Sequence, residues 1–333
     1  MNLLLYVPWF HLEAWQIPSP IGGHYTLFGW ELDLPRIVPV HPFGVLVALG
    51  VAVGAIVAER KGEALGLRRA AVAQAAAYVL IPAFVLAHVF DALFYHPELV
   101  LERPWYVLEL WNGLSSFGGF VGAVLGGLRW AQERQVPVRL VGDPIAYAFP
   151  FGWLFGRLGC FGVHDHPGRV TMFFLGVEDY HVGFPPYQVR HDLGFYEVLW
   201  CLAVIPLFVW LGKKERPTGF FLALLPLLYA PVRFGLDFLR ATDVELADER
   251  YLGLTPGHYG AVLLFAGGLQ VLAQIRRAPR LPIPASVALH PEPEVLPASP
   301  GREDEVTEPA AEEAGAVRRE GPEERPAHPE GRE

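Results

Sequence analysis

The chain has 333 residues, of which 52% are hydrophobic and only 18% charged. This composition is too apolar for an ordinary soluble domain and indicates a protein with several membrane-spanning helices. The formal net charge is −9, and no basic stripe suggests a nucleic-acid partner. The two cysteines, Cys160 and Cys201, lie in or beside apolar runs without metal-ligand spacing, so we expect neither a disulfide framework nor a metal site.

Residues 1–40 combine several tryptophans and prolines with a few acidic residues. Aromatic residues at this density are typical of the membrane–water interface. We therefore expect a periplasmic or interfacial amino-terminal arm that lies on the bilayer, and not a span. The first residues lack a basic region and a small-residue cleavage site, so we expect no removable signal peptide.

Seven apolar runs follow, and each approaches the length needed to cross roughly 30 Å of hydrocarbon. The third run is rich in glycine, at 118, 119, 122, 126 and 127, which suits close helix packing in lipid. We predict an all-α fold of about seven transmembrane helices in residues 41–280. The runs cover residues 43–57, 70–94, 114–128, 144–160, 195–211, 219–236 and 257–275.

Basic residues alternate between the two ends of these runs. They gather after the first, third, fifth and seventh runs, whereas the opposite loops carry isolated arginines. The positive-inside rule then places the amino terminus outside and the carboxyl terminus in the cytoplasm. The gathered residues are Arg60, Lys61, Arg68, Arg69, Arg129, Arg134, Arg139, Lys213, Lys214, Arg216, Arg276, Arg277 and Arg280.

Residues 281–333 have a different composition, dominated by Pro, Glu, Ala and Arg and without Phe, Trp or Tyr. Such a segment cannot bury enough apolar surface to offset the entropy of ordering it. We predict a disordered cytoplasmic tail that acts as a solvated spacer, and a specific function for it stays open.

Charged residues follow the fourth run, in residues 156–169. Ionisable residues at membrane depth are functional candidates because their burial is costly unless they are paired or hydrated. A guanidinium group offers a planar fork of donors that suits phosphate oxygens. Arg157, Asp165, Gly168 and Arg169 therefore predict an interfacial pocket for an anionic head group.

Three further clusters are candidates. His88 and Asp91 share a helix face, so Asp91 could orient a histidine base or simply brace the bundle. His191 and Tyr196 stand at the mouth of the fifth run, as site residues or as interfacial anchors. The third cluster lies along one helix stripe of the sixth run, as a site or as a structural ion pair. Its members are Tyr229, Arg233, Asp237 and Arg240.

These motifs resemble the prolipoprotein diacylglyceryl transferase family. The segment Gly156-Arg157-Leu158-Gly159-x-Phe161, with Gly168-Arg169, is similar to that family's signature. The segments at 115–122 and 190–197 are similar to its Gly-Gly motif and its His-Pro-x-Gln-Leu-Tyr-Glu element. The pattern Tyr229-x3-Arg233-Phe234-x2-Asp237-Phe238-x-Arg240 is similar to another helix of the family.

The resemblance implies a reaction at the bacterial inner membrane. The diacylglyceryl group of phosphatidylglycerol passes to the lipobox cysteine of a prolipoprotein, whose signal peptide is the second partner. Glycerol phosphate leaves, and no metal or organic cofactor takes part. Arg157 and Arg233 would hold the phosphate, assisted by Arg169 and Arg240. Asp165 and Asp237 would orient the arginines.

The chain departs from the family pattern at a few positions. Phe117 stands where the family usually has a histidine, Cys160 where it has asparagine and Phe43 where it has tyrosine. Asp165 and Asp237 replace glutamates, which keeps the charge and shortens the reach. His88 with Asp91, or else His166, is then the candidate base. Two alternatives remain: a degenerate homologue that binds phospholipid or signal peptides without chemistry, and a transporter, which the absence of an inverted repeat disfavours.

Overall fold

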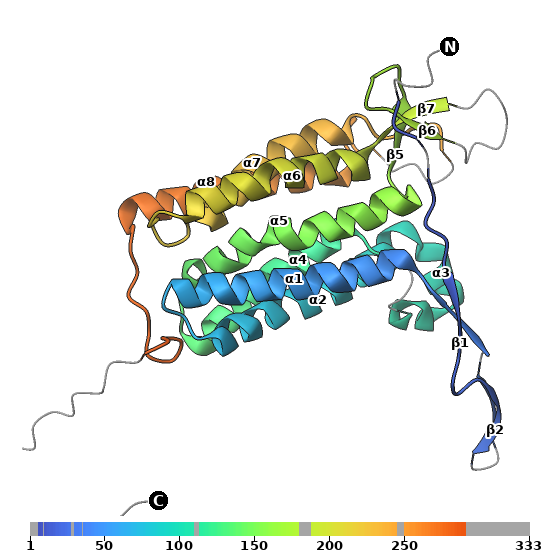
Figure 1. Ribbon diagram of the computed structural model, residues 1–333, viewed down its shortest axis with the longest axis horizontal. Helices are drawn as coiled ribbons and strands as arrows, with labels where there is room; N and C mark the ends of the chain where they lie inside the picture. The colour runs from blue at the N-terminus through green and yellow to red at the C-terminus, as the bar shows by residue number, and fades with distance from the viewer. Residues whose placement is uncertain are drawn as a thin grey trace, which may run out of the picture. The chain divides into compact units, whose positions relative to one another are not determined.

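The structure is a computed structural model that describes residues 6–8, 10–27, 30–34, 36–109, 113–179, 188–244 and 250–290. Within these residues the protein is predominantly helical, and seven helices have 18 or more residues (Figure 1). The long helices are α1 (Pro42–Ala64), α2 (Arg69–Tyr95), α4 (Ser116–Arg134), α5 (Val138–Val163), α6 (Leu193–Gly212), α7 (Phe220–Asp237) and α8 (Pro256–Arg277). Two short elements, α3 (Pro97–Glu102) and the 3-10 helix η1 (Pro104–Leu108), connect α2 to α4.

Five of the long helices are apolar and long enough to cross a membrane: α1, α2, α6, α7 and α8. The two others, α4 and α5, are not among these candidates, and Arg139, Asp143 and Arg157 lie inside α5. Every long helix coincides with one of the apolar runs of the sequence, so the helical content follows from hydropathy. The structure therefore supports a helical membrane protein with five candidate spans.

The helices pack in pairs, α1 with α5, α2 with α4 and α7 with α8, while α5 also packs against α6 and α7 (Figure 1). Glycines bring α4 against α2, because a Cβ added at Gly118, Gly122 or Gly126 would overlap a backbone carbonyl of α2. These glycines are four residues apart and share one face of α4. Their spacing confirms the expectation of close packing through small residues.

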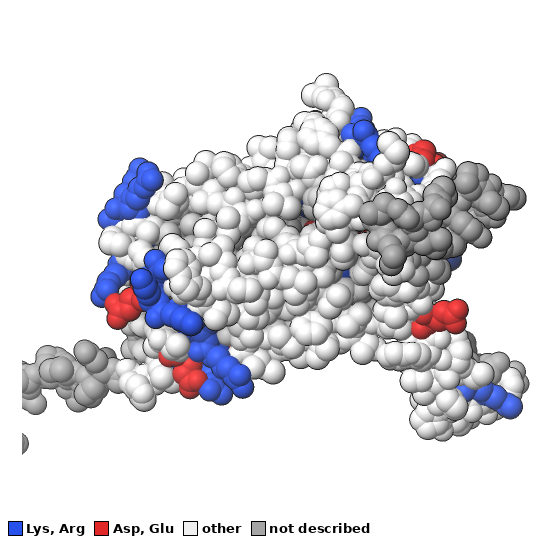
Figure 2. Space-filling view, turned by 45° about the horizontal axis from the view of Figure 1, so that its top comes forward, with Lys and Arg blue, Asp and Glu red and all other residues white. Residues whose placement is uncertain are grey.

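One end of the bundle is basic. Figure 2 shows Lys and Arg side chains gathered at this end, beside a broad surface with few charged side chains. Lys61 Nζ donates to the Gly212 carbonyl at 3.2 Å, and Arg139 donates to the carbonyls of Thr218 and Ala278. The loops predicted to share one membrane face therefore meet in space. Lys61 Nζ also lies over the Tyr147 ring, 4.9 Å from the ring centroid, and this cation–π contact adds to the packing.

The described residues also contain seven short strands, and the all-α prediction omitted them. In the amino-terminal arm, β1 (Trp15–Pro18) pairs with β4 (Ile37–Val40), and β2 (Gly23–Leu27) pairs with β3 (Trp30–Leu34). After α5, the antiparallel strands β5 (Pro167–Val170), β7 (Gln188–Asp192) and β6 (Val177–Asp179) form one sheet in that order. Strands of three to five residues are too short for a clear alternating pattern in the sequence.

The first ten residues of the predicted tail are not a solvated spacer. Val287 is 2% exposed and belongs to a core cluster with Leu67, Val72 and Trp130. The Arg68 amide donates to the Val287 carbonyl at 2.9 Å, which fixes the segment to the α1–α2 connection. Apolar residues at 281–289 can bury surface, unlike the Glu-rich sequence after them. The prediction of disorder for 291–333 lies outside the described residues.

Candidate active site

A single carboxylate, that of Glu197, lies at the centre of the candidate site. Glu197 lies in the first turns of α6 and is fully buried, with 0% of the residue exposed. Arg157 of α5 places Nε 2.9 Å from Glu197 Oε2, and a terminal nitrogen of Arg233 of α7 lies 3.8 Å from Oε1. Three helices thus bring two guanidinium groups to one acid.

Two aromatic side chains complete the surroundings of Glu197. The Tyr229 hydroxyl donates to Oε2 at 2.8 Å, and the Trp153 indole N–H donates to the same oxygen at 3.0 Å. The Arg157 guanidinium also lies over the Trp153 ring, 4.5 Å from its centroid. These contacts supply the partners without which a buried charge would be strongly destabilising.

Asp237 extends the network along α7. Its Oδ1 lies 2.9 Å from a terminal nitrogen of Arg233 and 3.0 Å from Nε of Arg240. Its Oδ2 accepts a hydrogen bond from the Thr255 hydroxyl and lies 3.4 Å from Nδ1 of His258. The i, i+4 spacing predicted the Arg233–Asp237 pair, and the structure contains it.

The start of α8 closes over this network at Gly257. A Cβ added there would lie 2.7 Å from Asp237 Oδ2 and 3.1 Å from a terminal nitrogen of Arg233. Glycine is therefore required for the close approach of α8 to the charged groups.

The segment after α5 brings Asp165 and His166 beside the same arginines. Burial raises the pKa of Asp165 to about 6, while the charge of Arg157 opposes the shift. Burial and the charges of Arg157, Arg240 and Arg233 lower the pKa of His166 well below its ordinary value. His166 is thus a neutral imidazole near neutral pH, and its side chain is 28% exposed.

Asp165 and His166 form a compact group with Cys160. The Cys160 sulfur, an Asp165 oxygen and a His166 nitrogen lie within 4.8 Å of one another, a donor set that a zinc ion could use. However, the positive charges of Arg157, Arg233 and Arg240 act on the same place and oppose a cation. These surroundings suit an anion better than a metal cation.

Strand β5 holds Gly168 and Arg169 against the end of α7. The Arg169 amide donates to the Leu239 carbonyl at 2.7 Å, and an added Cβ at Gly168 would lie 2.5 Å from His191 Cβ. The exposed Arg169 side chain places Nε 3.4 Å from the Arg240 carbonyl. Arg169 therefore stands at the rim of the site, and Gly168 permits the close contact of β5 with β7.

His191 and Tyr196 contact each other. The Tyr196 hydroxyl lies 2.7 Å from His191 Nδ1 and 3.3 Å from the Leu175 carbonyl. A similar bracing contact joins His164 Nδ1 to Asp192, at 2.7 Å. These pairs hold the sheet against the start of α6 and thereby position Glu197.

His88, a catalytic candidate from the sequence, has its hydrogen-bond contacts outside the Glu197 network. Its Nδ1 lies 3.2 Å from the Gly113 carbonyl and its Nε2 lies 3.1 Å from the Tyr106 carbonyl. Asp91 does not pair with His88 and instead lies 3.7 Å from His96 Nε2. Both ring nitrogens of His88 face backbone carbonyls. These contacts fit a residue that braces the helix bundle better than a catalytic base.

The sequence placed Glu197 only as the last residue of the 190–197 motif, without a role of its own, and did not indicate Thr255 or His258. Glu197 carried a usable signal, since it is an acidic residue inside an apolar run. His258 carried a weaker signal: it is the third residue of α8, and the residue before the helix is Thr255, a common helix cap. Their pairing with residues of α5 and α7 is a long-range contact that periodicity cannot reveal.

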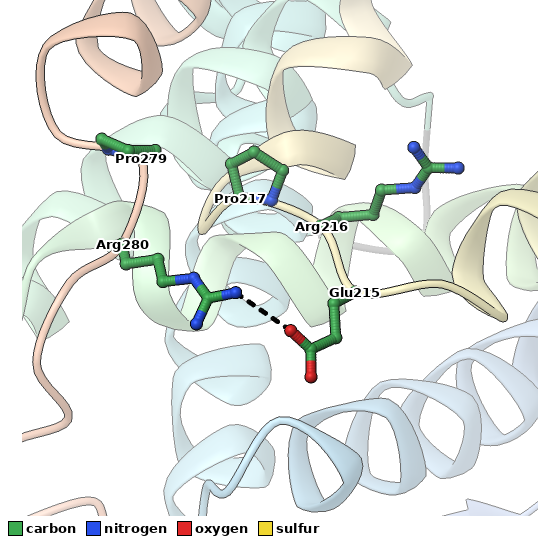
Figure 3. A pocket seen from close by; sticks show the side chains of 5 residues that line it. All are labelled: Glu215, Arg216, Pro217, Pro279 and Arg280. Carbon is green, nitrogen blue, oxygen red and sulfur yellow. Dashed lines mark hydrogen bonds and ion pairs between the residues drawn. The ribbon is translucent and has the colours of Figure 1, made fainter.

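A separate cavity of 360 Å³ lies at the basic end of the bundle (Figure 3). The exposed Arg280–Glu215 ion pair, 3.0 Å long, is drawn across it. Glu215 follows the last turn of α6, whereas Glu197 is near its start, so roughly 20 Å of helix separates the two. The cavity is therefore distinct from the Glu197 site.

The fold and the site define a multi-pass helical membrane protein with buried, paired arginines near one end of the bundle. A sequence model described as prolipoprotein diacylglyceryl transferase matches residues 32–274. The chain belongs to the prolipoprotein diacylglyceryl transferase family, as its motifs suggested.

Curated relatives carry the name of the same family. A phosphatidylglycerol–prolipoprotein diacylglyceryl transferase of Chromohalobacter salexigens is 28% identical over 72% of this chain and 90% of its own length. One from Teredinibacter turnerae is 27% identical over 71% of this chain and 82% of its own length. One from Xanthomonas axonopodis is 31% identical over 59% of this chain and 74% of its own length.

Proposed function

We propose that this protein transfers the diacylglyceryl group of phosphatidylglycerol to the lipobox cysteine thiol of prolipoproteins, the first step of lipoprotein maturation. One observation carries the proposal beyond family membership. Arg157 and Arg233, from two different helices, converge on the buried carboxylate of Glu197. Such a pair of fixed guanidinium groups suits the phosphodiester of a lipid head group.

We place the enzyme in the bacterial inner membrane, with all seven long helices crossing it. The gathering of basic loops at one end supports a cytoplasmic carboxyl terminus and an external amino terminus. The Glu197 site would then lie toward the outer leaflet, where the cysteine of an exported precursor arrives.

The arginines act on the leaving group in this proposal. Arg157 and Arg233 bind the phosphate, with Arg240 and Arg169 nearer the rim, while Asp165 and Asp237 orient them. The cysteine sulfur attacks the glyceryl carbon, the bond from that carbon to the phosphate oxygen breaks, and glycerol phosphate leaves with the electron pair. Preorganised positive charge stabilises the leaving phosphate most as this bond breaks.

His166 is the base that we propose for the thiol proton, because thiolate is the nucleophilic form of cysteine. It is neutral, partly exposed and within the influence of three arginines. Binding of the phosphate anion would offset these positive charges and raise the basicity of His166 once the lipid is in place. His164, His191 and His258 each use Nδ1 in a contact with another residue.

The names of the relatives favour this transferase over the alternative of a degenerate homologue that only binds lipids or signal peptides. Expression in a bacterial strain depleted of its own transferase tests the proposal, with thioether lipidation of a reporter lipoprotein as the readout. We expect lipidation to be restored. Normal membrane expression without lipidation would contradict catalysis.

The base is tested by comparing two histidines in the same assay. We expect His166→Ala to lower kcat by about 10²–10⁴ with a small change in KM, as for loss of a general base. His88→Ala should retain turnover per folded molecule and lose stability instead. The reverse result, with His88 required and His166 dispensable, would overturn the assignment.

A further inference from the structure

His258 has a buried donor that no described contact satisfies. The residue lies in the first turn of α8 and is 0% exposed. Its Nε2 has no hydrogen-bond partner among the described residues, unlike its Nδ1. Buried polar groups in proteins are nearly always paired, and an exception calls for an explanation such as a ligand.

The contacts of the ring determine where its proton lies. The Thr255 amide donates to His258 Nδ1 at 3.1 Å, as in a capping box. A proton on Nδ1 would point at that amide hydrogen, so the neutral ring carries its proton on Nε2. The Thr255 hydroxyl meanwhile donates to Asp237. His258 is therefore preset as a hydrogen-bond donor at Nε2.

The other nitrogen of the ring, Nδ1, lies one carboxylate away from the arginines of the site. Asp237 contacts His258 through Oδ2 and both Arg233 and Arg240 through Oδ1. Positive charges and a fixed N–H donor on one side of the bundle together favour an anionic oxygen as ligand.

The ring is covered by aromatic side chains and not by backbone alone. Phe238 lies edge-on to His258, with ring centroids 4.3 Å apart, and is itself 42% exposed. Phe234 contacts the imidazole on a second side, at 4.8 Å. Phe238 follows the last residue of α7, so a change of its side-chain rotamer requires no unfolding of a helix.

We infer that His258 binds the phospholipid substrate by donating a hydrogen bond from Nε2 to a phosphodiester oxygen of its head group. The inference rests on the proposed function and adds a lipid contact that lies outside the motifs of the sequence. His258 acts as a substrate-binding residue in this scheme, and it needs no change of protonation during the reaction.

Two substitutions of His258 test the roles of Nδ1 and Nε2 separately. Asn places its amide near the position of Nδ1 and removes the outer donor, whereas Gln places an N–H donor near Nε2. We expect His258→Asn to raise KM for phosphatidylglycerol about tenfold or more, with a smaller change in kcat. His258→Gln should recover most of this affinity even though it disturbs the capping box.

Thermal unfolding in detergent provides a readout that does not depend on turnover. Phosphatidylglycerol should raise the Tm of the wild type, and the rise should be smaller for His258→Asn and restored for His258→Gln. Glycerol 1-phosphate is the second probe: a Tm response to it that the substitutions abolish would assign the contact to free phosphates as well as lipid.

The outcomes distinguish the two proposals. A wild type that binds phosphatidylglycerol but transfers nothing would contradict the proposed function and leave the lipid contact intact. A His258→Asn variant with wild-type KM and wild-type lipid response would overturn the inference. The inference would also be overturned if His258→Gln weakened phosphatidylglycerol binding and His258→Asn did not. That result would indicate that His258 only caps the helix.

Discussion

Arg157 and Arg233 lie on different helices and are both ion-paired to one acid, the buried Glu197 of α6. The acid compensates the two positive charges while the lipid is absent and fixes the distance between them. An incoming phosphate would therefore meet guanidinium groups whose positions are already set, which lowers the entropy cost of binding.

Replacement of Glu197 should be the most damaging single change to this site. Glu197→Gln keeps the shape, removes the ion-pair partner of the buried Arg157 and leaves Arg233 with Asp237 alone, so we expect a loss of about 3–5 kcal/mol in stability. Thermal unfolding in detergent measures the loss, and lipidation activity should disappear with it. Glu215→Gln is the matched control, because its ion pair with Arg280 is exposed and should matter little. Equal effects of both changes would contradict the central role of Glu197.

The Tyr229 hydroxyl should contribute through its hydrogen bond to Glu197. Tyr229→Phe keeps the ring and leaves Oε2 one donor short, at an expected cost of about 2 kcal/mol. Tyr259→Phe removes a hydroxyl that donates to the Tyr251 carbonyl in an exposed setting, and should cost less. Comparison of the two Tm values is the measurement, and a larger loss for Tyr259→Phe would refute the prediction.

Gly257 should be intolerant of any side chain. Gly257→Ala places a Cβ against Asp237 and Arg233, so we expect both Tm and transfer activity to fall. Gly267, on the same helix, has open space around its Cα, and Gly267→Ala should gain about 0.5–1 kcal/mol from helix propensity. We expect Gly257→Ala to lower Tm and Gly267→Ala to raise it. A rise in Tm for Gly257→Ala would show that α8 does not closely contact Asp237 and Arg233.

Asp165 should make stability depend on pH. Burial raises the pKa of Asp165 from 3.8 to about 6, so the folded protein holds this proton more tightly than the unfolded chain. The contribution is complete below about pH 4 and is lost as pH rises to about 6. Asp165→Asn removes this dependence, so the variant should have the higher Tm at pH 7 and a shrinking advantage toward pH 4. Its transfer activity should fall, because the acid is proposed to orient Arg157. A variant less stable than the wild type at pH 7 would contradict the sign.

Parts of the site could be derived from particular residues. The helix stripe of Tyr229, Arg233 and Asp237 followed from spacing alone, and the Arg233–Asp237 pair exists. The pairing of His88 with Asp91 followed from the same rule and is absent, because nearby backbone carbonyls engage His88 instead. Spacing on one helix shows which side chains can meet, and competing partners from elsewhere in the fold decide whether they do.

Sequence alone determined the helical membrane character, the close packing of one glycine-rich helix and the family; the structure identified α2 as the partner of that helix. Hydropathy and the spacing of small residues are patterns among residues close in sequence, so the sequence alone reveals them. Only the tertiary structure decided that Glu197 compensates two arginines, that β5 joins the end of α7 and that His258 faces Asp237. Arg157 lies in α5 and Glu197 in α6, and the three strands β5, β6 and β7 stand between them in the sequence. A buried charge is stabilised by whichever partners the completed packing brings to it.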